Sequence, residues 1–513
     1  MKRICTLLLC AGMLLGAASG AKAIDFKVKG QWLMGFNVAD TSLVHKTRLQ
    51  GKEAKHQEDK FHAAQRVRLQ LDAVASESLS GTVYFEIGTQ TWGQAASGGA
   101  LGADSKDVIK LKRAYIDWMV PETELQFRMG IQGVALPNVA GGSAIMDTDV
   151  AGITANYKIN DNVGITALWA RPLNDNYNGA MANGTINPNR VNYLDNLDLF
   201  SVMVPITLDG YEITPWVMYG MKGKNAMKGI DGFEGFQNGY YTADGNLPYS
   251  LYPYPGMIGS NDIGSTSKTY GSLFWAGLPI AITAFDPLNI EIDLNYGYSE
   301  EMGKFWTSKD MGTVWKHAST KREGWLAKAL VEYKMDWGVP GIFGWYASGD
   351  DDNVKNGSER MPSIVPMGTF TSFLGDGNMG WIAQDYALDY SGTWGVGIQL
   401  RDMTFIEDLS HTFRAAYWGG TNSTGMVKYM QTAYSWNDGW ASGTSPYLTT
   451  NDGLLEFNLV NSYQMYENFQ INLELDYVAN FMDNDTWKKA GMRDSSFDKQ
   501  DAWKVQATFA YSF

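Results

Sequence analysis

The stretch Leu288–Tyr298, which reads LNIEIDLNYGY, alternates between apolar and polar side chains. Leucine, isoleucine and tyrosine occupy one set of positions, while asparagine, glutamate and aspartate occupy most of the other. Successive side chains of a β-strand point to opposite faces of its sheet, so the pattern predicts a strand with one apolar and one polar side. The stretch Phe469–Ala479, FQINLELDYVA, repeats the same arrangement.

These predicted strands are long for a soluble protein. Arg66–Val74 and Trp325–Met335 also alternate, and each run is close to the roughly 9–11 residues that a tilted strand needs to cross a bilayer. Strands of a soluble β-sandwich, the alternative with the same alternation, average only about 5–6 residues. The apolar faces also tend to end in Tyr, Trp or Phe, which are enriched at membrane interfaces. The sequence therefore predicts an all-β fold, a transmembrane antiparallel β-barrel.

The connections between the predicted strands alternate between short and long. Short turns are predicted at Ser76–Ser80, Val120–Glu122, Asn160–Asn162, Thr207–Gly210, Ala281–Pro287, Gly338–Pro340, Asp402–Ser410 and Tyr466–Asn468. Long polar segments lie between them, among them Ala39–Lys60, Gly220–Ser267, Gly349–Tyr390 and Gly420–Asn451. Short periplasmic turns and long external loops are typical of membrane barrels. Eight hairpins with one further strand at each end predict about 18 strands, with 16 as the alternative.

The first 23 residues have the features of a cleaved secretory signal peptide. Lys2 and Arg3 precede the uncharged apolar run Ile4–Ala18, and Ala21-Lys22-Ala23 matches the small-x-small cleavage pattern. The apolar run is short for a helix that would anchor the chain in a membrane. We therefore expect residues 1–23 to be removed and residues 24–513 to form a single barrel domain.

Removal of this segment changes the composition of the chain. Both cysteines, Cys5 and Cys10, lie within it, so disulfides and thiolate chemistry are excluded from the mature protein. A lipid anchor at Cys10 is the alternative, but Leu9 stands where such a site has a small residue. Loss of Lys2, Arg3 and Lys22 changes the formal net charge from −14 to −17, which argues against nucleic acid as a partner. The mature chain also lacks the roughly 18 consecutive apolar residues of a transmembrane helix.

The last predicted strand carries the most specific signal. Its alternate residues are Trp503, Val505, Ala507, Phe509, Tyr511 and Phe513. An alternating aromatic strand that ends on phenylalanine resembles the C-terminal signal by which outer-membrane barrels are recognised for assembly. Phe513 is therefore a candidate assembly signal.

With these features together, the chain resembles the trimeric porins of Gram-negative outer membranes, most closely the homotrimeric porin family of sulfate-reducing bacteria. The resemblance covers essentially the whole mature chain. It is carried by Ile24-Asp25-Phe26-Lys27-Val28-Lys29-Gly30, by Glu124–Ile131 with the loop after it, and by Phe513. It implies a water-filled pore in each of three subunits, through which small hydrophilic solutes and ions diffuse passively. The partners it implies are the homotrimer, outer-membrane lipid with its lipopolysaccharide, and the barrel-assembly machinery.

In such porins the third external loop folds into the barrel and narrows it. By the strand count this loop is Gln132–Thr148, and it is less polar than the neighbouring loops, as a loop packed inside a barrel should be. The alternative is an external loop with an apolar tip. Asp147 lies near the end of this segment and is a candidate constriction residue.

Strand alternation selects the candidate pore-lining residues. If Leu69 and Leu71 face lipid, and Phe127 and Met129 do likewise, the residues between them point into the lumen. Charged side chains on the lipid face would cost about 2–4 kcal/mol at mid-depth, which supports this inward assignment. The basic candidates are Arg66, Arg68, Lys110, Lys112 and Arg128. Arg113 breaks the alternation, which predicts a β-bulge at that point.

Acidic residues occupy the polar faces of later strands. They are Glu291, Asp293, Glu332, Glu456, Glu474 and Asp476. We expect the basic strands and these acidic strands to set up a transverse field in which polar solutes orient. The alternative is that many of these charges pair with neighbours in their own wall.

Signatures of enzymes and metal sites are scarce. The chain has no Gly-x-Ser-x-Gly or His-Glu-x-x-His motif, and its five histidines lack metal-ligand spacing. Asp350, Asp351 and Asp352 could hold Ca²⁺ in an external loop, but their spacing does not fit an EF-hand and a solvated acidic loop is the simpler interpretation. No cofactor is expected. A general diffusion porin is the favoured function, and a substrate-preferring channel, for example for sugars, or a barrel enzyme such as a lipase or protease are the alternatives.

Overall fold

The computed structural model describes residues 24–513 except 42, 44–59, 96–97, 102–108, 175–180, 183–184, 187–195, 224–250, 252–267, 310–313, 375–388, 431–445 and 490–498. The predicted signal peptide and its cleavage site lie outside the described residues. In the part of the chain that the structure describes, no helix is long and apolar enough to cross a membrane.

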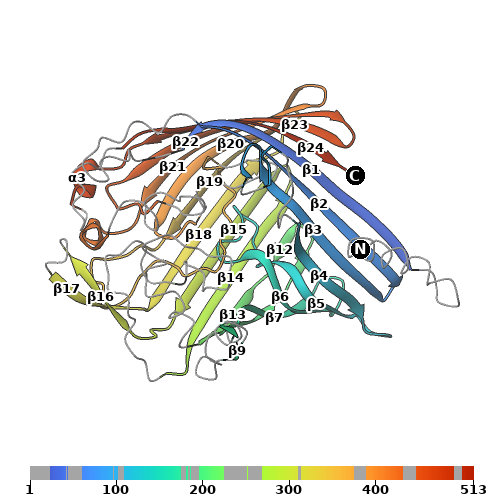
Figure 1. The fold of residues 1–513 in the computed structure, drawn as a ribbon, viewed down its shortest axis with the longest axis horizontal. Coiled ribbons are helices and arrows are strands. Elements are labelled where there is room, and N and C mark those ends of the chain that lie inside the picture. Colours follow the sequence, from blue (N-terminus) through green and yellow to red (C-terminus); the bar gives the residue numbers. More distant parts are fainter. Residues whose placement is uncertain are drawn as a thin grey trace.

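The fold is one closed antiparallel β-sheet that forms a barrel (Figure 1). The strands of this sheet are β1 (Asp25–Asp40), β2 (Lys60–Ser76), β3 (Leu79–Thr91), β4 (Ile109–Met119), β5 (Leu125–Ala135), β6 (Asp147–Lys158), β7 (Gly164–Asn174), β10 (Asn196–Met203), β11 (Ile206–Leu208), β12 (Tyr211–Ile213), β13 (Trp216–Gly223), β14 (Tyr270–Phe285), β15 (Leu288–Ser299), β18 (Arg322–Tyr333), β19 (Val339–Ala347), β20 (Thr393–Ile406), β21 (Leu409–Gly420), β22 (Gly453–Tyr466), β23 (Phe469–Asn480) and β24 (Ala502–Ser512). Smaller elements in the connections are the hairpins β8 (Met181–Ala182) with β9 (Thr185–Ile186) and β16 (Lys304–Lys309) with β17 (Val314–Ser319), the 3-10 helix η6 (Thr424–Tyr429) and the short helix α3 (Asn484–Trp487).

The 20 strands of the sheet make 18 passages, because two passages are each divided by a proline. Pro205 separates β10 from β11, and Pro215 separates β12 from β13. Proline has no N–H to donate to a neighbouring strand, and at this point the N–H of Val204 donates to the carbonyl of Pro215 (3.0 Å). The prediction of about 18 antiparallel strands joined by eight short turns is confirmed.

Exposed aromatic side chains form rows on the outer face of the barrel. Trp169, Phe200, Tyr219 and Phe274 are direct partners across β7, β10, β13 and β14, and each is between 36% and 45% exposed. A second set lies near the short turns and includes Phe285, Tyr333, Trp337, Phe405, Tyr466 and Phe513. Two aromatic levels with an apolar surface between them are the outer surface that a bilayer requires.

Other large aromatic residues point inward. Trp345 of β19 lies 4.4 Å from Trp418 of β21, measured between ring centroids, and 5.2 Å from Tyr390 of the connection between β19 and β20. Phe343 stacks on Phe370 at 4.8 Å. The apolar core therefore lies inside the barrel, between the wall and segments of the loops.

The first and last strands close the barrel. β1 pairs with β24 from Gln31 and Ser512 to Asp40 and Trp503. Phe513 continues the pairing, since its N–H donates to the carbonyl of Gly30 (3.0 Å) and its carbonyl accepts from the N–H of Gly30 (2.8 Å). A Cβ at Gly30 would lie 2.6 Å from the Phe513 ring, so glycine at this position leaves room for the terminal side chain.

We predict that deletion of Phe513 impairs barrel assembly, because it removes two backbone hydrogen bonds at the seam and the ring that stacks on Tyr511 at 5.7 Å. The measurement is the fraction of heat-modifiable, folded protein on SDS gels. Phe405→Ala is the matched control, since Phe405 is a 68% exposed aromatic near another turn and lies away from the seam. Wild-type levels of folded protein after deletion of Phe513 would contradict the prediction.

Candidate functional site: the interior of the barrel

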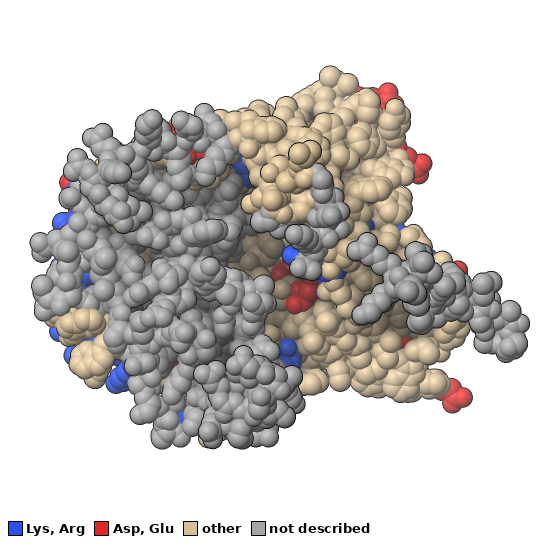
Figure 2. All heavy atoms as spheres, in the orientation of Figure 1, with Lys and Arg blue, Asp and Glu red and all other residues tan. Residues whose placement is uncertain are grey.

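The inner wall of the barrel has two contrasting parts. On β18 the inward residues from Leu326 to Glu332 are at most 8% exposed. On β2 and β5, in contrast, the inward side chains of Arg68 and Arg128 remain 26% and 37% exposed. Figure 2 shows a hollow in one face of the molecule in which atoms of both basic and acidic residues are visible. The part of the inner wall whose side chains remain more exposed therefore lies on the early strands, among them β2 and β5.

The segment Leu136–Met146, which connects β5 to β6, covers part of the opposite wall. The N–H groups of Val139 and Ala140 donate to the carboxylate of Asp293 on β15. Lys328 of β18 donates to the carbonyl of Ala140, and Trp216 of β13 donates to the carbonyl of Pro137 (3.2 Å). The connection is shorter than the predicted Gln132–Thr148, because Gln132–Ala135 and Asp147–Thr148 belong to strands.

A second segment, Met361–Leu374 of the connection between β19 and β20, lies against the first. The N–H of Met367 donates to the carbonyl of Ser143 (2.8 Å), and the N–H of Thr369 donates to the carbonyl of Gly141 (2.9 Å). The N–H groups of Ile364 and Val365 both donate to the carbonyl of Ile145. Backbone hydrogen bonds thus join two loops that are more than 200 residues apart in the sequence.

The far end of the second segment is attached to the late strands. Ser372 donates to Glu474 of β23 (2.6 Å), the N–H of Phe373 donates to Glu456 of β22, and Lys504 of β24 donates to the carbonyl of Leu374 (3.2 Å). Phe373 also stacks on Trp418 at 5.6 Å. Sequence reasoning missed this segment, although apolar residues clustered at Phe370–Leu374 in a polar connection were a usable signal.

Two of the predicted pore-lining arginines form ion pairs along their own wall. Arg68 contacts Glu86 of β3 (2.8 Å). Arg128 donates two hydrogen bonds to Asp117 of β4 (2.8 and 2.9 Å), and its guanidinium lies 4.3 Å from the centre of the Tyr115 ring. Arg66 lies two residues before Arg68 and is only 5% exposed. The pairs agree with the alternative that charges are satisfied within a wall.

A β-bulge changes the register of β4 at the second of the two predicted pore-lining lysines, Lys110 and Lys112. Tyr84 pairs with Arg113 and Phe85 pairs with Leu111, so Lys112 is the extra residue and the predicted β-bulge is confirmed. Lys110 is in register with Glu86, whereas Lys112 contacts Asp149 (2.8 Å) together with Arg113 (2.6 Å). The simple alternation that grouped Lys110 with Lys112 therefore does not hold across the bulge.

Asp147 is the first residue of β6, and not a loop residue as the sequence suggested. Its N–H donates to the carbonyl of Val365 in the second segment (2.9 Å). Its place at a constriction stays a prediction.

The acidic residues of the later strands contact the loops or their own wall. Asp293, Glu456 and Glu474 accept hydrogen bonds from the two loop segments. Glu332 pairs with Arg401 of β20 (2.5 Å), and Glu291 accepts from Asn289 (2.9 Å). Asp476 accepts from Asn458 (2.6 Å). These local contacts are of the kind that the alternative expected, and the transverse field between a basic and an acidic wall stays a prediction.

The acidic loop at Asp350–Asp352 is held by hydrogen bonds. Asp350 is buried and accepts from Ser358 (2.5 Å) and Tyr447 (2.7 Å), and burial raises the pKa of its carboxyl. Asp351 accepts from the N–H of Asn353 (2.7 Å). Burial also raises the pKa of Glu359 to about 7. The described residues contain no group of three or more His, Cys, Asp or Glu arranged to hold a metal ion.

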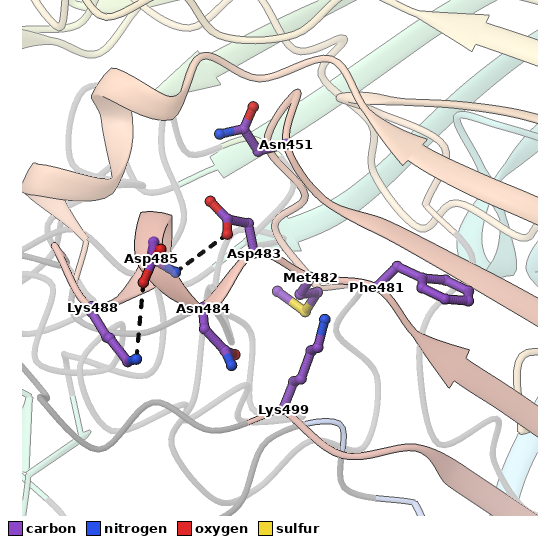
Figure 3. Close-up of a pocket in the computed structure, with 8 residues that line it drawn as sticks. All are labelled: Asn451, Phe481, Met482, Asp483, Asn484, Asp485, Lys488 and Lys499. Carbon is purple, nitrogen blue, oxygen red and sulfur yellow. Dashed lines mark hydrogen bonds and ion pairs between the residues drawn. The ribbon is translucent and has the colours of Figure 1, made fainter.

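A separate cavity of about 560 Å³ lies where the connections meet β22 and β23 (Figure 3). Its lining residues are Asn451, Phe481, Met482, Asp483, Asn484, Asp485, Lys488 and Lys499. Asp483 caps α3 by accepting from the N–H groups of Asp485 and Thr486. Asp483 therefore stabilises the start of α3.

Comparison with known proteins finds similar solved structures but no relative by sequence. No protein-family model matches the chain, and no curated protein matches it in sequence. The crystal structure of OccK11 (OpdR) from Pseudomonas aeruginosa is similar with a TM-score of 0.48 and 11% identity, covering 96% of this chain and 98% of that one. The crystal structure of OccAB3 from Acinetobacter baumannii is similar with a TM-score of 0.47 and 10% identity, and the match covers 95% of this chain and 99% of that one. The crystal structure of OccK2 (OpdF) from Pseudomonas aeruginosa, solved in complex with glucuronate, is similar with a TM-score of 0.48 and 9% identity. The match covers 95% of this chain and 98% of that one.

We predict that Arg68→Gln with Arg128→Gln shifts the reversal potential in planar bilayers towards cations, and that Glu86→Gln with Asp117→Asn shifts it towards anions. Charges act over a screening length of about 8 Å at physiological salt, so the members of each ion pair should influence a passing ion with opposite sign. Combining all four changes should restore a value near that of the wild type.

The control for this prediction is Lys355→Gln with Lys488→Gln, which removes the same charge from exposed loop positions. The control should change the reversal potential much less. Equal shifts from the arginine pair and the lysine pair would show that the arginines do not line the path of the ions.

Proposed function

We propose that the chain is an outer-membrane porin of a Gram-negative bacterium, a water-filled channel for passive diffusion of small hydrophilic solutes and ions. The observation that carries this proposal is a closed barrel of 18 passages whose outer face bears rows of exposed aromatic rings and whose inner wall bears partly exposed ion pairs. A barrel with this number of strands is wide enough to enclose water. A channel, and not an enzyme, is the activity that this arrangement supports.

The outer surface supports the membrane location. Backbone groups within a bilayer have no water to bind, so only helices and closed sheets span it. The pairing of β1 with β24 leaves the sheet without an edge. Exposed apolar residues such as Val217, Leu294 and Ile342 lie on the outer face, between the two aromatic levels.

We further propose that Leu136–Met146 is the constriction and that Met361–Leu374 narrows the lumen with it. Both segments hydrogen-bond to inward residues of the late strands, and the arginines of β2 and β5 stay partly exposed. Solutes would then pass along the early strands, beside the pairs Arg68–Glu86 and Arg128–Asp117. Arg66, Lys110, Lys112 and Asp147 remain candidates for the lining of this path.

A substrate-preferring channel is the second candidate, and the coverage of the late strands favours it because a narrow path selects solutes more strictly. A stacking track for sugars made of the inward aromatics has less support. Trp275, Phe343, Trp345 and Trp418 are at most 4% exposed, since loop segments pack on this wall, so their rings are not available to a passing solute.

Reconstitution into planar bilayers and liposomes tests the proposal. We expect stable unitary conductance that rises linearly with salt concentration, and swelling of liposomes in small but not large sugars. Concentration-dependent block by one class of solute would favour the substrate-preferring channel. Folded protein that inserts into the bilayer without conductance would contradict both forms of the proposal.

The oligomeric state is part of the proposal and rests on the resemblance to trimeric porins, among them the porins of sulfate-reducing bacteria. A signal peptide at residues 1–23, contacts with lipopolysaccharide and recognition of Phe513 by the assembly machinery belong to the same proposal. We predict a homotrimer that resists SDS and dissociates on boiling. A monomer in mild detergent, measured by light scattering with the detergent mass subtracted, would contradict it.

A further inference from the structure

Asp293 and Lys328 form a buried ion pair on the inner wall of the barrel. They are direct partners in the register of β15 and β18, and the Lys328 Nζ lies 3.3 Å from the Asp293 Oδ2. Their side chains are 2% and 0% exposed. Removing two charges from water costs free energy that an apolar pair of similar volume would not cost. Strand pairing alone therefore gives no reason for charges at this position.

Both members of the pair bind the same short stretch of the first loop segment. Asp293 accepts from the N–H groups of Val139 and Ala140, and Lys328 donates to the carbonyls of Ala140 and Gly142. A carboxylate offers only acceptors and an ammonium only donors, so the two side chains together satisfy both kinds of backbone group. Backbone groups buried without partners would be costly, and these four have charged partners.

Tyr390 connects this attachment to the second loop segment. Its hydroxyl donates to the carbonyl of Gly141 (2.8 Å) and lies 3.2 Å from the N–H groups of Thr369 and Phe370, which donate to it. The ammonium of Lys328 lies 5.6 Å from the centre of the Tyr390 ring, within the range of a cation–π contact. The ion pair, the tyrosine and both loop segments are therefore one connected network.

We propose that Asp293 and Lys328 are positioning residues that hold Leu136–Met146 across the lumen and so set the size limit of the channel. Tyr390 extends this attachment to Met361–Leu374, so the two segments keep one arrangement together. The expected change in permeation rests on the proposed function. The expected loosening of the loop segment rests only on the contacts described above.

The chain contains a matched ion pair for comparison. Glu332 lies on the same face of β18 as Lys328, four residues further along the strand, and pairs with Arg401 of β20. Glu332 is 4% exposed and also accepts from Gln399 and Asn289, which are residues of the wall. Changes to Glu332 and Arg401 therefore remove a wall ion pair whose carboxylate is similarly buried, although Arg401 itself is 39% exposed, and they leave the contacts of Lys328 in place.

The test compares Lys328→Met/Asp293→Leu with Glu332→Leu/Arg401→Met in full-length protein. Both changes remove a pair of charges together, so neither leaves a single buried charge. We expect the first variant to conduct roughly twofold more than the wild type and to admit larger sugars in liposome swelling, because the narrowest section limits both. We expect the second variant to keep the wild-type conductance and size limit.

Hydrogen exchange measured by mass spectrometry gives a readout that does not depend on conduction. Faster exchange at residues 136–146 in Lys328→Met/Asp293→Leu, and not in Glu332→Leu/Arg401→Met, is expected. Tyr390→Phe, which removes one hydroxyl, should give a smaller change in the same direction and serves if the double variant does not fold. Unchanged exchange and unchanged conductance in a folded variant would overturn the inference. Faster hydrogen exchange at residues 136–146 in a protein that never conducts would overturn the proposed function. It would still support the role of Asp293 and Lys328 in holding the loop segment.

Discussion

The closure of the sheet is the constraint on which the rest of the molecule depends. A strand in lipid can hydrogen-bond only to neighbouring strands, so the sheet must end where it began. The pairing of β1 with β24, extended by Gly30 and Phe513, meets that requirement. Once closed, the sheet has one face for lipid and one for the interior. The period-two alternation of apolar and polar residues follows from this division.

Closure also creates a space that the wall cannot fill. The side chains of a barrel with 18 passages do not meet across its centre, and loop segments occupy part of the interior. Loop backbone brought inside needs hydrogen-bonding partners. The wall supplies them through Asp293, Lys328, Glu456 and Lys504, while Phe343, Trp345 and Trp418 supply an apolar surface. Several of the buried charges in this barrel thus bind loops.

Charge on the less covered wall is organised differently. Arg68 with Glu86 and Arg128 with Asp117 are cross-strand pairs, so each positive group has a negative group within a few ångströms. A passing solute would meet alternating local charges, and the formal net charge of the whole chain would describe its surroundings poorly. Ion preference should therefore follow the charges of these two wall pairs.

The sequence by itself determined the barrel, its strand number and its short turns, because alternation and turn residues are local properties. It also located the bulge near Arg113, whereas the pore-lining role of Arg68 and Arg128 stays a prediction. It did not reveal that Lys112 leaves the alternation, that Asp147 begins a strand, or that Met361–Leu374 lies beside Leu136–Met146. Those features, and the pairing of Asp293 with Lys328 beneath a loop about 150 residues away in the chain, depend on which segments meet in space. Only the closed tertiary structure brings them together, since no local pattern records a contact between distant loops.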